Sequence, residues 1–530
     1  MNGMMDTTAF PRFVGKHVIV AGIGVSGVSA ARALAGLGAR VTVVDGTDGE
    51  RQRETACELE KHAITVRLGD GESLPDGTEL IVTSPGWKPS SPLFKAAAQA
   101  GIEVWGDVEL AWRLRNSAAA RSSRPSPATA LNRGGRQVGP QAAPWLAVTG
   151  TNGKTTTVQM LASILTAAGL RTAAVGNIGT PILDVVLCGG PYDVLAVELS
   201  SYQLHWAPSL RVHSAAVLNL APDHLDWHGG SMAAYAADKG RIYEGNQVAC
   251  VYNTADPATE ELVRAADVEE GCRAIGFTLG TPGPSELGVV EGILVDRAFV
   301  EDRQRNAQEL AEISDIGQAL AHPSKEGASR PFDPAPHNIA NALAAAALAR
   351  AYGVEPKAVR DGLRAFRLDA HRIAHVGTVD GVEYVDDSKA TNTHAAEASL
   401  AAYEHIVWIA GGLAKGATFD EIVIKSAKRL RGVVLIGADR ALIAEALRRH
   451  APEVPVVSLE RTDTEAMAAA VDAARALARP GDTVLLAPAC ASMDMFANYG
   501  QRGDAFADAV RAIAGPPAPQ QGEQDQQQDH

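Results

Sequence analysis

The segment best suited to chemistry is glycine-rich and lies just past the first quarter of the chain. Residues 145–157 read WLAVTGTNGKTTT, an apolar run followed by a tight turn and the polar start of a helix. Backbone N–H groups of such a turn bind phosphates, a lysine neutralises their charge, and a threonine hydroxyl can ligate magnesium. The sequence therefore predicts an ATP site, although Val148 stands where the full phosphate-loop pattern has another glycine. The residues expected to form it are Gly150, Thr151, Asn152, Gly153, Lys154, Thr155 and Thr156.

Two segments further along place an acid and a histidine where they could hold a metal ion. Glu198 follows the apolar run 193–197, and His224 lies in the segment 219–226, NLAPDHLD, after another apolar run. The carboxyl ends of parallel strands meet at one edge of a sheet, and magnesium prefers oxygen ligands such as carboxylates. We therefore expect Glu198 and His224 to ligate magnesium together with Thr155, although a histidine taken alone is more often structural.

A second glycine-rich turn lies near the start of the chain. Residues 22–27 read GIGVSG, follow an apolar run and open a helix, and an aspartate ends the next apolar run. Glycines let the backbone approach a diphosphate at the helix N-terminus, and the acid can hold a ribose hydroxyl. The pattern fits an NAD-type cofactor, a nucleotide-bearing substrate such as a UDP-sugar, or a purely structural turn, and it does not separate them. The residues expected at this site are Gly22, Gly24, Val25, Ser26, Gly27 and Asp45.

Polar loops after apolar runs recur in the last two fifths of the chain. They read DDSKATN at 386–392, GGLAKG at 411–416 and PACASMD at 488–494. The segment HNIANA at 337–342 instead opens a helix, which Asn338 could cap, or Asn338 could offer its amide to a purine. Loops that follow strand ends are where α/β folds bind ligands. The lysine in the double-glycine loop suits an anion, although a plain turn explains that loop nearly as well.

The elements that must hold these loops alternate between apolar strands and Ala- and Leu-rich helices. Strands are expected at residues 18–21, 41–44, 80–83, 102–104, 145–149, 194–197, 215–218, 405–410, 433–436 and 483–486, and helices at 28–37, 93–100 and 338–352. Strands separated by helices imply parallel sheets. The pattern predicts an α/β protein with three domains at residues 15–113, 144–368 and 369–514. A disordered linker or insertion is expected at 114–143, an irregular stretch at 301–336 and a disordered tail at 515–530.

Composition and charge narrow the class of protein. The chain has 530 residues, 46% hydrophobic and 21% charged, with 48 Lys and Arg against 62 Asp and Glu, a formal net charge of −14. A negative total argues against general nucleic-acid binding, which needs a basic surface. The five cysteines lie far apart without metal-ligand spacing, and no apolar run approaches the roughly 20 residues that span a membrane. We expect a reduced, cytoplasmic protein without nucleic-acid or membrane partners.

Together these segments resemble the Mur ligase family of peptidoglycan synthesis. The resemblance rests on GTNGKTT at Gly150, on Asp223-His224 and on the helix that begins at His337-Asn338, and it covers residues 15–113 and 144–514. The loop DDSKATN is most similar to that of the members that join D-glutamate to UDP-N-acetylmuramoyl-L-alanine. The family implies a Rossmann-like UDP-binding domain, a central P-loop ATPase-like domain and a C-terminal Rossmann-like domain.

The resemblance also implies a reaction, an ATP- and Mg²⁺-dependent amide ligation. A substrate carboxylate attacks the γ-phosphate to give an acyl phosphate, and the amine of D-glutamate then displaces phosphate. By resemblance, the catalytic residues are Lys154, His224, Lys239 and Lys389. A carbamate on Lys239 would ligate metal with Thr155, Glu198 and His224, whereas its position alone would suggest an ordinary surface lysine.

The remaining site residues are also carried over by resemblance. Asn338, Arg372 and Asp387 serve ATP, and Lys389 also contacts the transferred phosphoryl group. Gly86 and Asn177 join the turn at Gly22 in binding the UDP-linked substrate. The carboxylates of D-glutamate are received by Lys415, Ser492 and Tyr499. We expect a monomer.

Two positions depart from the family pattern, and two other functions compete. Thr47 stands where some members have an arginine near the uracil, and Tyr499 stands where phenylalanine is common. An NAD-dependent oxidoreductase would use the turn at Gly22 but leaves residues 150–157 unexplained. A catalytically inactive nucleotide-binding protein would be expected to lose Lys154, Glu198 or Lys389, and all three are present.

Overall fold

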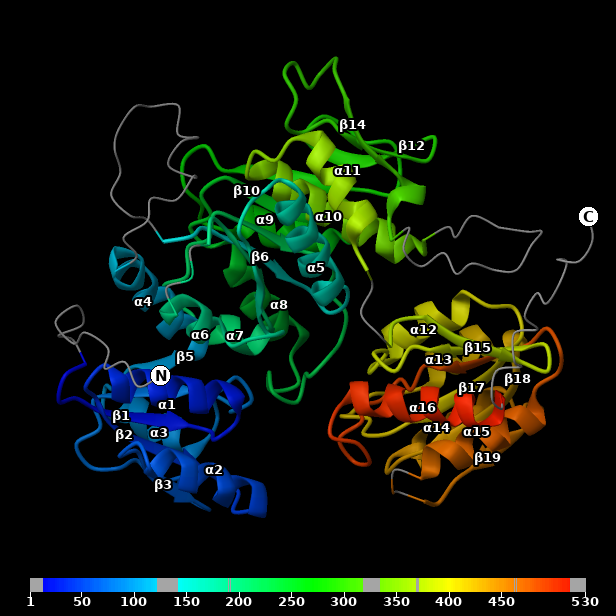
Figure 1. The fold of residues 1–530 in the computed structure, drawn as a ribbon, viewed down its shortest axis with the longest axis horizontal. Coiled ribbons are helices and arrows are strands. Elements are labelled where there is room, and N and C mark those ends of the chain that lie inside the picture. Colours follow the sequence, from blue (N-terminus) through cyan, green and yellow to red (C-terminus); the bar gives the residue numbers. More distant parts are fainter. Residues whose placement is uncertain are drawn as a thin grey trace, which may run out of the picture. The chain divides into compact units, whose positions relative to one another are not determined.

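The computed structural model in Figure 1 describes residues 13–121, 142–188, 190, 192–317, 334–367, 371–461, 463 and 465–514, with only the backbone for 116–121. The chain divides into two units, Met1–Arg367 and Leu368–His530. The first unit contains two sheets and the second contains one. The expected α/β class with parallel sheets is confirmed.

The first sheet has five parallel strands in the order β3-β2-β1-β4-β5. Its central strand, β1 (His17–Ala21), is buried along its whole length, as its run of β-branched residues predicts. The other strands are β2 (Arg40–Asp45), β3 (Thr65–Leu68), β4 (Leu80–Thr83) and β5 (Val104–Gly106). The helices are α1 (Val25–Gly36), α2 (Glu50–Glu60), α3 (Pro92–Gln99) and α4 (Asp107–Arg121). The turn at Gly22–Gly27 thus joins β1 to α1 at the carboxyl edge of the sheet.

The second sheet of this unit has nine strands in the order β14-β13-β12-β11-β10-β9-β6-β8-β7. They are β6 (Trp145–Thr149), β7 (Ala174–Gly176), β8 (Leu195–Glu198), β9 (Ser214–Val217), β10 (Ala249–Asn253), β11 (Arg273–Phe277), β12 (Glu286–Val290), β13 (Ile293–Asp296) and β14 (Gln308–Glu312). The strands from β7 to β12 are parallel, and β13 and β14 add an antiparallel edge. The helices are α5 (Lys154–Ala167), α6 (Ile182–Leu187), α7 (Ser201–His205), α8 (Met232–Gly240), α9 (Pro257–Ala265), α10 (Pro336–Ala351) and α11 (Pro356–Ala365).

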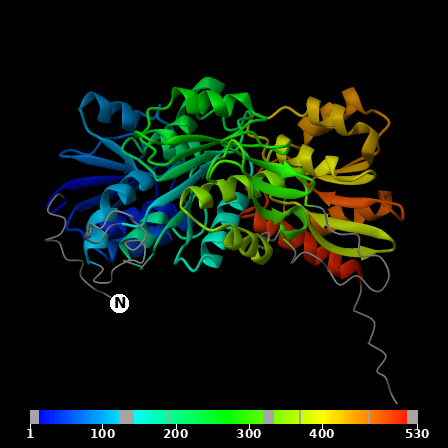
Figure 2. The same cartoon turned by 90° about the horizontal axis from the view of Figure 1, so that it is seen from above.

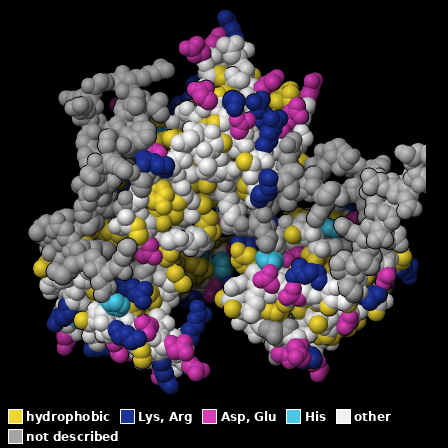
Figure 3. Space-filling view, in the orientation of Figure 1, with side chains coloured by type: hydrophobic (Ala, Val, Ile, Leu, Met, Phe, Trp, Pro, Cys, Tyr) yellow, Lys and Arg dark blue, Asp and Glu magenta, His cyan; other side chains and the backbone are white. Residues whose placement is uncertain are grey.

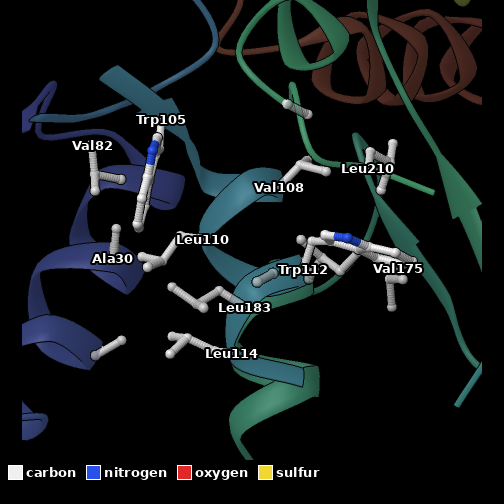
Figure 4. Packing of buried hydrophobic residues seen from close by; sticks show 14 of the residues in the cluster. Ala30, Val82, Trp105, Val108, Leu110, Trp112, Leu114, Val175, Leu183 and Leu210 are labelled. Atoms are coloured by element: carbon white, nitrogen blue, oxygen red, sulfur yellow. The ribbon is translucent and has the colours of Figure 1, made fainter. Parts of the chain in front are cut away.

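Helix α4 joins the two sheets of the first unit through one continuous hydrophobic cluster. Figure 4 shows Leu110 and Leu114 of α4 beside Ala30 of α1 and Leu183 of α6. Between these two leucines, the ring of Trp112 lies edge to face with that of Trp145 in β6, with centroids 5.0 Å apart. Burial of large apolar side chains restrains hinge motion between packed layers, because opening them would expose that surface to water. The phosphate turn and the turn at Gly22 therefore belong to one packed body.

The second unit has a six-stranded sheet in the order β15-β16-β20-β17-β18-β19. The strands are β15 (Ala374–Val379), β16 (Val382–Asp386), β17 (Ile406–Gly411), β18 (Leu430–Ile436), β19 (Val456–Ser458) and β20 (Thr483–Leu486); only β15 is antiparallel. Its helices are α12 (Thr393–Ala401), α13 (Asp420–Ser426), α14 (Arg440–His450), α15 (Ala466–Leu477) and α16 (Tyr499–Ala514). Figure 2 shows α16, in red, running along one face of this sheet.

Some expectations from the sequence need correction. Helix α4 continues to Arg121, so the linker expected from residue 114 begins too early, and residues 122–141 lie outside the described part, as does the tail 515–530. The stretch 301–336 was expected to be irregular, but it contains β14. That strand is an edge strand with only two buried residues, so its sequence lacks the apolar signal of a central strand.

Two further observations concern the charge of the surface and the length and polarity of the helices. On the face shown in Figure 3, basic and acidic side chains are interspersed. Among the described residues, each helix is too short or too polar to cross a lipid bilayer.

Candidate functional site

The predicted phosphate turn lies between β6 and α5. Gly150 and Gly153 have φ of 152° and 83°, which favour glycine, and a Cβ atom on Gly153 would overlap the amide of Asn341. Asn219 fixes the turn from the next strand: its Oδ1 accepts a hydrogen bond from the N–H of Asn152 at 2.9 Å, and its Nδ2 donates to that residue's carbonyl at 3.1 Å. Asn219 thus fixes the conformation of the turn at the N-terminus of α5, where a helix dipole favours an anion.

Two lysines converge on the carbonyl oxygen of Gly150. Lys154 Nζ donates to it at 2.9 Å and to the carbonyl of Thr151 at 2.7 Å, while Lys239 Nζ donates to it at 2.8 Å. Lys239 lies at the end of α8 and is only 2% exposed, so it is not the surface lysine that its position suggests. Burial and the neighbouring Lys154 ammonium hold the pKa of Lys239 well below its usual value.

A buried carboxylate lies one strand away from the phosphate turn. Glu198 ends β8, pairs in register with Val148 of β6, and is 2% exposed. Its Oε1 accepts a hydrogen bond from Asn177 Nδ2 at 2.9 Å, while its Oε2 is buried without a hydrogen-bond partner among the described residues. A buried, unpaired carboxylate oxygen beside a phosphate turn fits a cation ligand, because an uncompensated charge is otherwise costly to bury.

His224 and Thr155 complete the expected metal set only in part. His224 has a left-handed φ of 51°, its ring centroid lies 5.4 Å from that of Tyr202, and its Nε2 is 3.5 Å from Asp223 Oδ1. Thr155 is buried in the first turn of α5. Over the described ranges, no three His, Cys, Asp or Glu side chains gather as metal ligands. Glu198 and His224 would therefore need oxygen donors of another kind.

The other glycine turn needs glycine at two of its positions, Gly22 and Gly27. Gly22 has a φ of 102°, and a Cβ atom on Gly27 would overlap the carbonyl oxygen of Gly22. Asp45 ties the turn to the end of β2: its Oδ2 accepts from the N–H of Ile23 at 2.9 Å, and its Oδ1 accepts from the hydroxyl of Thr47 at 2.6 Å. A Cβ atom on Gly86, in the loop after β4, meets nothing within 4 Å, so that backbone is open to a ligand.

Two glycine substitutions test whether Gly27 packs against backbone while Gly24 has free space around it. Gly27→Ala should lower the midpoint of urea unfolding, because its methyl group overlaps backbone; overpacking typically costs about 1–3 kcal/mol. Gly24→Ala should leave that midpoint nearly unchanged, since its φ is −72° and a Cβ atom there has no neighbour within 4 Å. Equal midpoints for the two variants would contradict the backbone packing described for the turn.

A cavity of about 1130 Å³ opens beside this turn. It starts at Gly24 and Val25, passes along α1 to Arg32, and is bounded by Arg51 of α2 and by α6. Within the described part of the chain, the guanidinium groups of Arg32 and Arg51 form no ion pair with a carboxylate. The carboxylates of Asp45 and Asp184 also line the cavity, but both accept hydrogen bonds from neighbouring residues, so the two guanidinium groups are left to bind an anion.

In the second unit, the loop after β16 is held by buried polar groups. Burial raises the pKa of Asp387 to about 7, although the hydroxyl of Ser399 donates to its Oδ2 and Arg372 lies close enough to favour the charged form. The neighbouring Asp386 accepts from His371 Nδ1 at 2.6 Å. In the first unit, Asn338 is buried in the first turn of α10.

Two other loops of the second unit meet at the same sheet edge. Backbone bonds between Leu413 and Ala491, at 2.9 and 3.0 Å, join the segment of Lys415 to that of the buried Ser492. Lys415 has a left-handed φ of 50°. Beside them, Lys389 Nζ donates to the hydroxyl of Tyr499 at 2.7 Å. The loops singled out in the sequence are therefore brought together within each unit.

Three residues of these sites were missed in the sequence. Tyr235, whose hydroxyl is 2.9 Å from Thr151 Oγ1, and the fully buried Arg502 gave no local signal, because their partners lie far away in sequence. Arg51 gave none either, since an arginine in an acidic helix looks like an ordinary surface residue.

Comparison with known proteins gives three matching family models. They are "Mur ligase MurD-like, N-terminal domain" at residues 16–106, "Mur ligase middle domain" at 148–349 and "Mur ligase, glutamate ligase domain" at 371–490. A Streptomyces coelicolor protein named UDP-N-acetylmuramoylalanine--D-glutamate ligase is 75% identical over 501 residues, which are 94% of this chain and 99% of that protein. The chain belongs to the Mur ligase family.

Other relatives agree with this membership. A Thermobifida fusca protein of the same name is 55% identical, over 94% of this chain and 99% of its own. The solved structure of a pseudomurein peptide ligase type C from Methanothermus fervidus aligns with a TM-score of 0.53 at 19% identity, covering 94% of this chain and all of that one. That likeness shows that the Mur ligase fold is shared at low sequence identity.

Proposed function

We propose that this Mur ligase joins D-glutamate to UDP-N-acetylmuramoyl-L-alanine at the expense of ATP, in cytoplasmic synthesis of peptidoglycan precursors. The observation that carries the proposal is the 75% identity, over nearly the whole chain, to a protein named for that reaction. Support from the structure is the presence of two glycine-rich nucleotide turns in one packed unit. An NAD-dependent oxidoreductase would leave the second turn without a purpose.

The residues of the phosphate turn would orient ATP for attack by the substrate. The N–H groups in the first turn of α5 would bind the phosphates, since those of Thr151 and Asn152 donate to Asn219, and Lys154 would exchange its carbonyl partners for phosphate oxygens. The alanine carboxylate then attacks the γ-phosphorus, ADP leaves, and an acyl phosphate forms. Asn177, which is held by Glu198, would contact the substrate beside this point. Positioning and charge neutralisation supply most of the catalysis in such transfers.

Glu198, His224 and Thr155 would hold Mg²⁺, with Lys239 as a carbamate supplying further oxygens. The metal ion neutralises charge that develops on the transferred phosphoryl group. The unpaired Oε2 of Glu198 and the buried Lys239 amine support this assignment. A carbamate forms when a neutral amine bonds to the carbon of CO₂ and releases a proton, so the lowered pKa of Lys239 favours it.

The second unit would bind D-glutamate and would also contact ATP. Lys415, Ser492 and Tyr499 would contact the carboxylates of D-glutamate, and Asp387, Arg372 and Lys389 would act on ATP and the phosphoryl group. The amine of D-glutamate attacks the acyl carbon, and phosphate leaves from a tetrahedral intermediate whose oxyanion needs nearby donors. We propose a monomer that acts on these small molecules alone.

The proposal is tested by measuring ADP and phosphate release with the amide product followed by mass spectrometry. Release should require ATP, a divalent cation, UDP-N-acetylmuramoyl-L-alanine and D-glutamate together, and L-glutamate should not replace the D-enantiomer. Turnover of a nicotinamide cofactor without an amide product would overturn the proposal.

The cavity beside α1 gives a test of the UDP site. Arg51→Ala should raise the KM for UDP-N-acetylmuramoyl-L-alanine about ten-fold and leave the KM for ATP unchanged, since a hydrogen bond to a charged group contributes roughly 1.5–3 kcal/mol. Arg53→Ala is the matched control: it lies on the same helix, pairs with Asp48 and does not line the cavity. If Arg51→Ala and Arg53→Ala have the same KM for UDP-N-acetylmuramoyl-L-alanine, the cavity is not part of the substrate site.

A further inference from the structure

Two cysteines meet in the second sheet, at the edge opposite to the phosphate turn. Cys250 is the second residue of β10, and Cys272 directly precedes β11, the parallel neighbour of β10. Their Sγ atoms lie 3.9 Å apart. Both residues stand at the amino ends of their strands, whereas the phosphate turn follows the carboxyl end of β6 in the same parallel sheet. The pair is therefore separate from the proposed ATP site and has no part in the proposed reaction.

The two thiols differ in their access to water. Cys250 is 2% exposed and belongs to the hydrophobic cluster of the first unit, where Asn246 Nδ2 donates to its Sγ at 3.5 Å. Cys272 is half-buried and follows the exposed loop 267–271. A small molecule in solution can therefore reach Cys272, while Cys250 is covered by its neighbours.

The contact between the thiols makes the accessible one the more readily ionised of the two. The thiol of Cys250 shares its proton with the sulfur of Cys272, which lowers the pKa of Cys272. The same contact, together with burial, raises the pKa of Cys250. The thiolate is the form that attacks peroxides, and redox-reactive cysteines are accessible thiols of lowered pKa beside a second thiol. In a cytoplasmic protein, disulfides are usually of this transient, redox-reactive kind.

The backbone before Cys272 leaves room for the two sulfurs to meet. A disulfide needs a distance of about 2.05 Å between them, so the sulfurs must approach from their present separation. Gly271 has a φ of 89°, and a Cβ atom there would meet nothing within 4 Å. Because the loop before it is exposed, Cys272 can shift toward Cys250 while β10 stays in place.

We propose that Cys272 and Cys250 form a thiol pair that reduces hydroperoxides and is itself oxidised to a disulfide. The Cys272 thiolate attacks one oxygen of hydrogen peroxide, the O–O bond breaks, and the leaving hydroxide takes up a proton to become water. The Cys250 thiol then attacks the sulfur of the new sulfenic acid, so that an S–S bond forms and the S–O bond breaks. The hydroxide that leaves takes the Cys250 proton as a second water. Two thiols and one peroxide thus give one disulfide and two waters.

Oxidation of the full chain by a small excess of hydrogen peroxide tests this pair. The remaining thiols are alkylated, and the protein is digested without a reductant. Mass spectrometry should find the Cys250 peptide joined to the Cys272 peptide, with two hydrogen atoms fewer than the two reduced peptides together, and dithiothreitol should restore both thiols. The exposed thiols of Cys57 and Cys188 are internal controls, and neither should appear in a linked peptide. Sulfinic acid at Cys272 with Cys250 still reduced would overturn the inference.

Two variants test which thiol reacts first. Cys250→Ala should lose the linked peptide and leave Cys272 as a sulfenic acid that dimedone traps, since the second thiol is gone. Cys272→Ala should leave Cys250 reduced, because peroxide does not reach it. Oxidation of Cys250 in Cys272→Ala as fast as that of Cys188 would overturn the order of the two steps. The linked peptide is measured on the unsubstituted protein and needs no amide formation, so its presence or absence is independent of the proposed function.

Discussion

Lys154→Ala should abolish amide formation while binding of the UDP-linked substrate survives. The amine of Lys154 lies on the phosphate turn, whereas the turn at Gly22 belongs to a different sheet. Removing a preorganised charge that faces the transferred phosphoryl group costs about 3–4 kcal/mol or more of transition-state stabilisation, which lowers the rate on the order of 10²- to 10³-fold. The fall should be seen in kcat, because the contact strengthens as charge develops.

Calorimetry separates the two nucleotide sites in this variant. Binding of UDP-N-acetylmuramoyl-L-alanine should keep its affinity within about two-fold, while ATP binding weakens. Lys357→Ala is the control, since that lysine is exposed in α11 and forms an ion pair with Asp361 on the same helix. Loss of both ligands from a folded Lys154 variant would contradict the division of the two sites between the sheets.

Lys239→Ala should lose most activity and regain part of it with a short carboxylic acid. Its long arm ends beside Gly150 and Thr149, and a carboxylate there could replace the missing carbamate oxygens at the metal ion. We expect kcat to fall by about 10²-fold or more, since one transition-state charge contact is worth that much. Formate or acetate at millimolar concentration should restore a measurable fraction, whereas chloride at the same ionic strength should not.

The chemical state of Lys239 can be read directly. A carbamate is expected to appear as ¹³C label on this residue when the protein is equilibrated with ¹³C-bicarbonate near neutral pH. The lowered pKa of the Lys239 amine determines how carbamate formation depends on pH. Because this amine stays neutral at lower pH than an exposed lysine does, its carbamate should persist to lower pH and be lost only as the amine becomes protonated. Full activity of Lys239→Ala would show that the residue has no catalytic part.

The two glycine-rich turns could be predicted because the residues that form each turn are neighbours in the sequence. The strand, turn and helix at Trp145–Thr157 specify a phosphate turn through glycines that tolerate unusual φ and through the lysine that follows them. The same holds for the turn at Gly22. A Cβ atom on Gly153 would overlap the side chain of Asn341, and a Cβ atom on Gly27 would overlap the backbone of Gly22.

The rest of the site depends on pairs that lie far apart in the sequence. Lys389 and Tyr499 are 110 residues apart, and Asp238 is shared by His205 and His228, 33 and 10 residues earlier. Strand register and helix packing bring such groups together, and neither is visible in a local pattern. The burial of Lys239 was missed for the same reason, since α8 alone gives no sign of which neighbours cover it.

Transfer of ¹⁸O from the substrate carboxylate to the released phosphate tests the central claim most directly. UDP-N-acetylmuramoyl-L-alanine labelled with ¹⁸O in both carboxyl oxygens should be incubated with ATP, Mg²⁺ and D-glutamate until one equivalent of product has formed. If the carboxylate attacks the γ-phosphorus and phosphate later leaves the acyl carbon, each phosphate carries one ¹⁸O atom and the new amide keeps the other. Unlabelled phosphate formed together with the amide would contradict the account, because the ¹⁸O atom lost from the carboxylate would then have left as water.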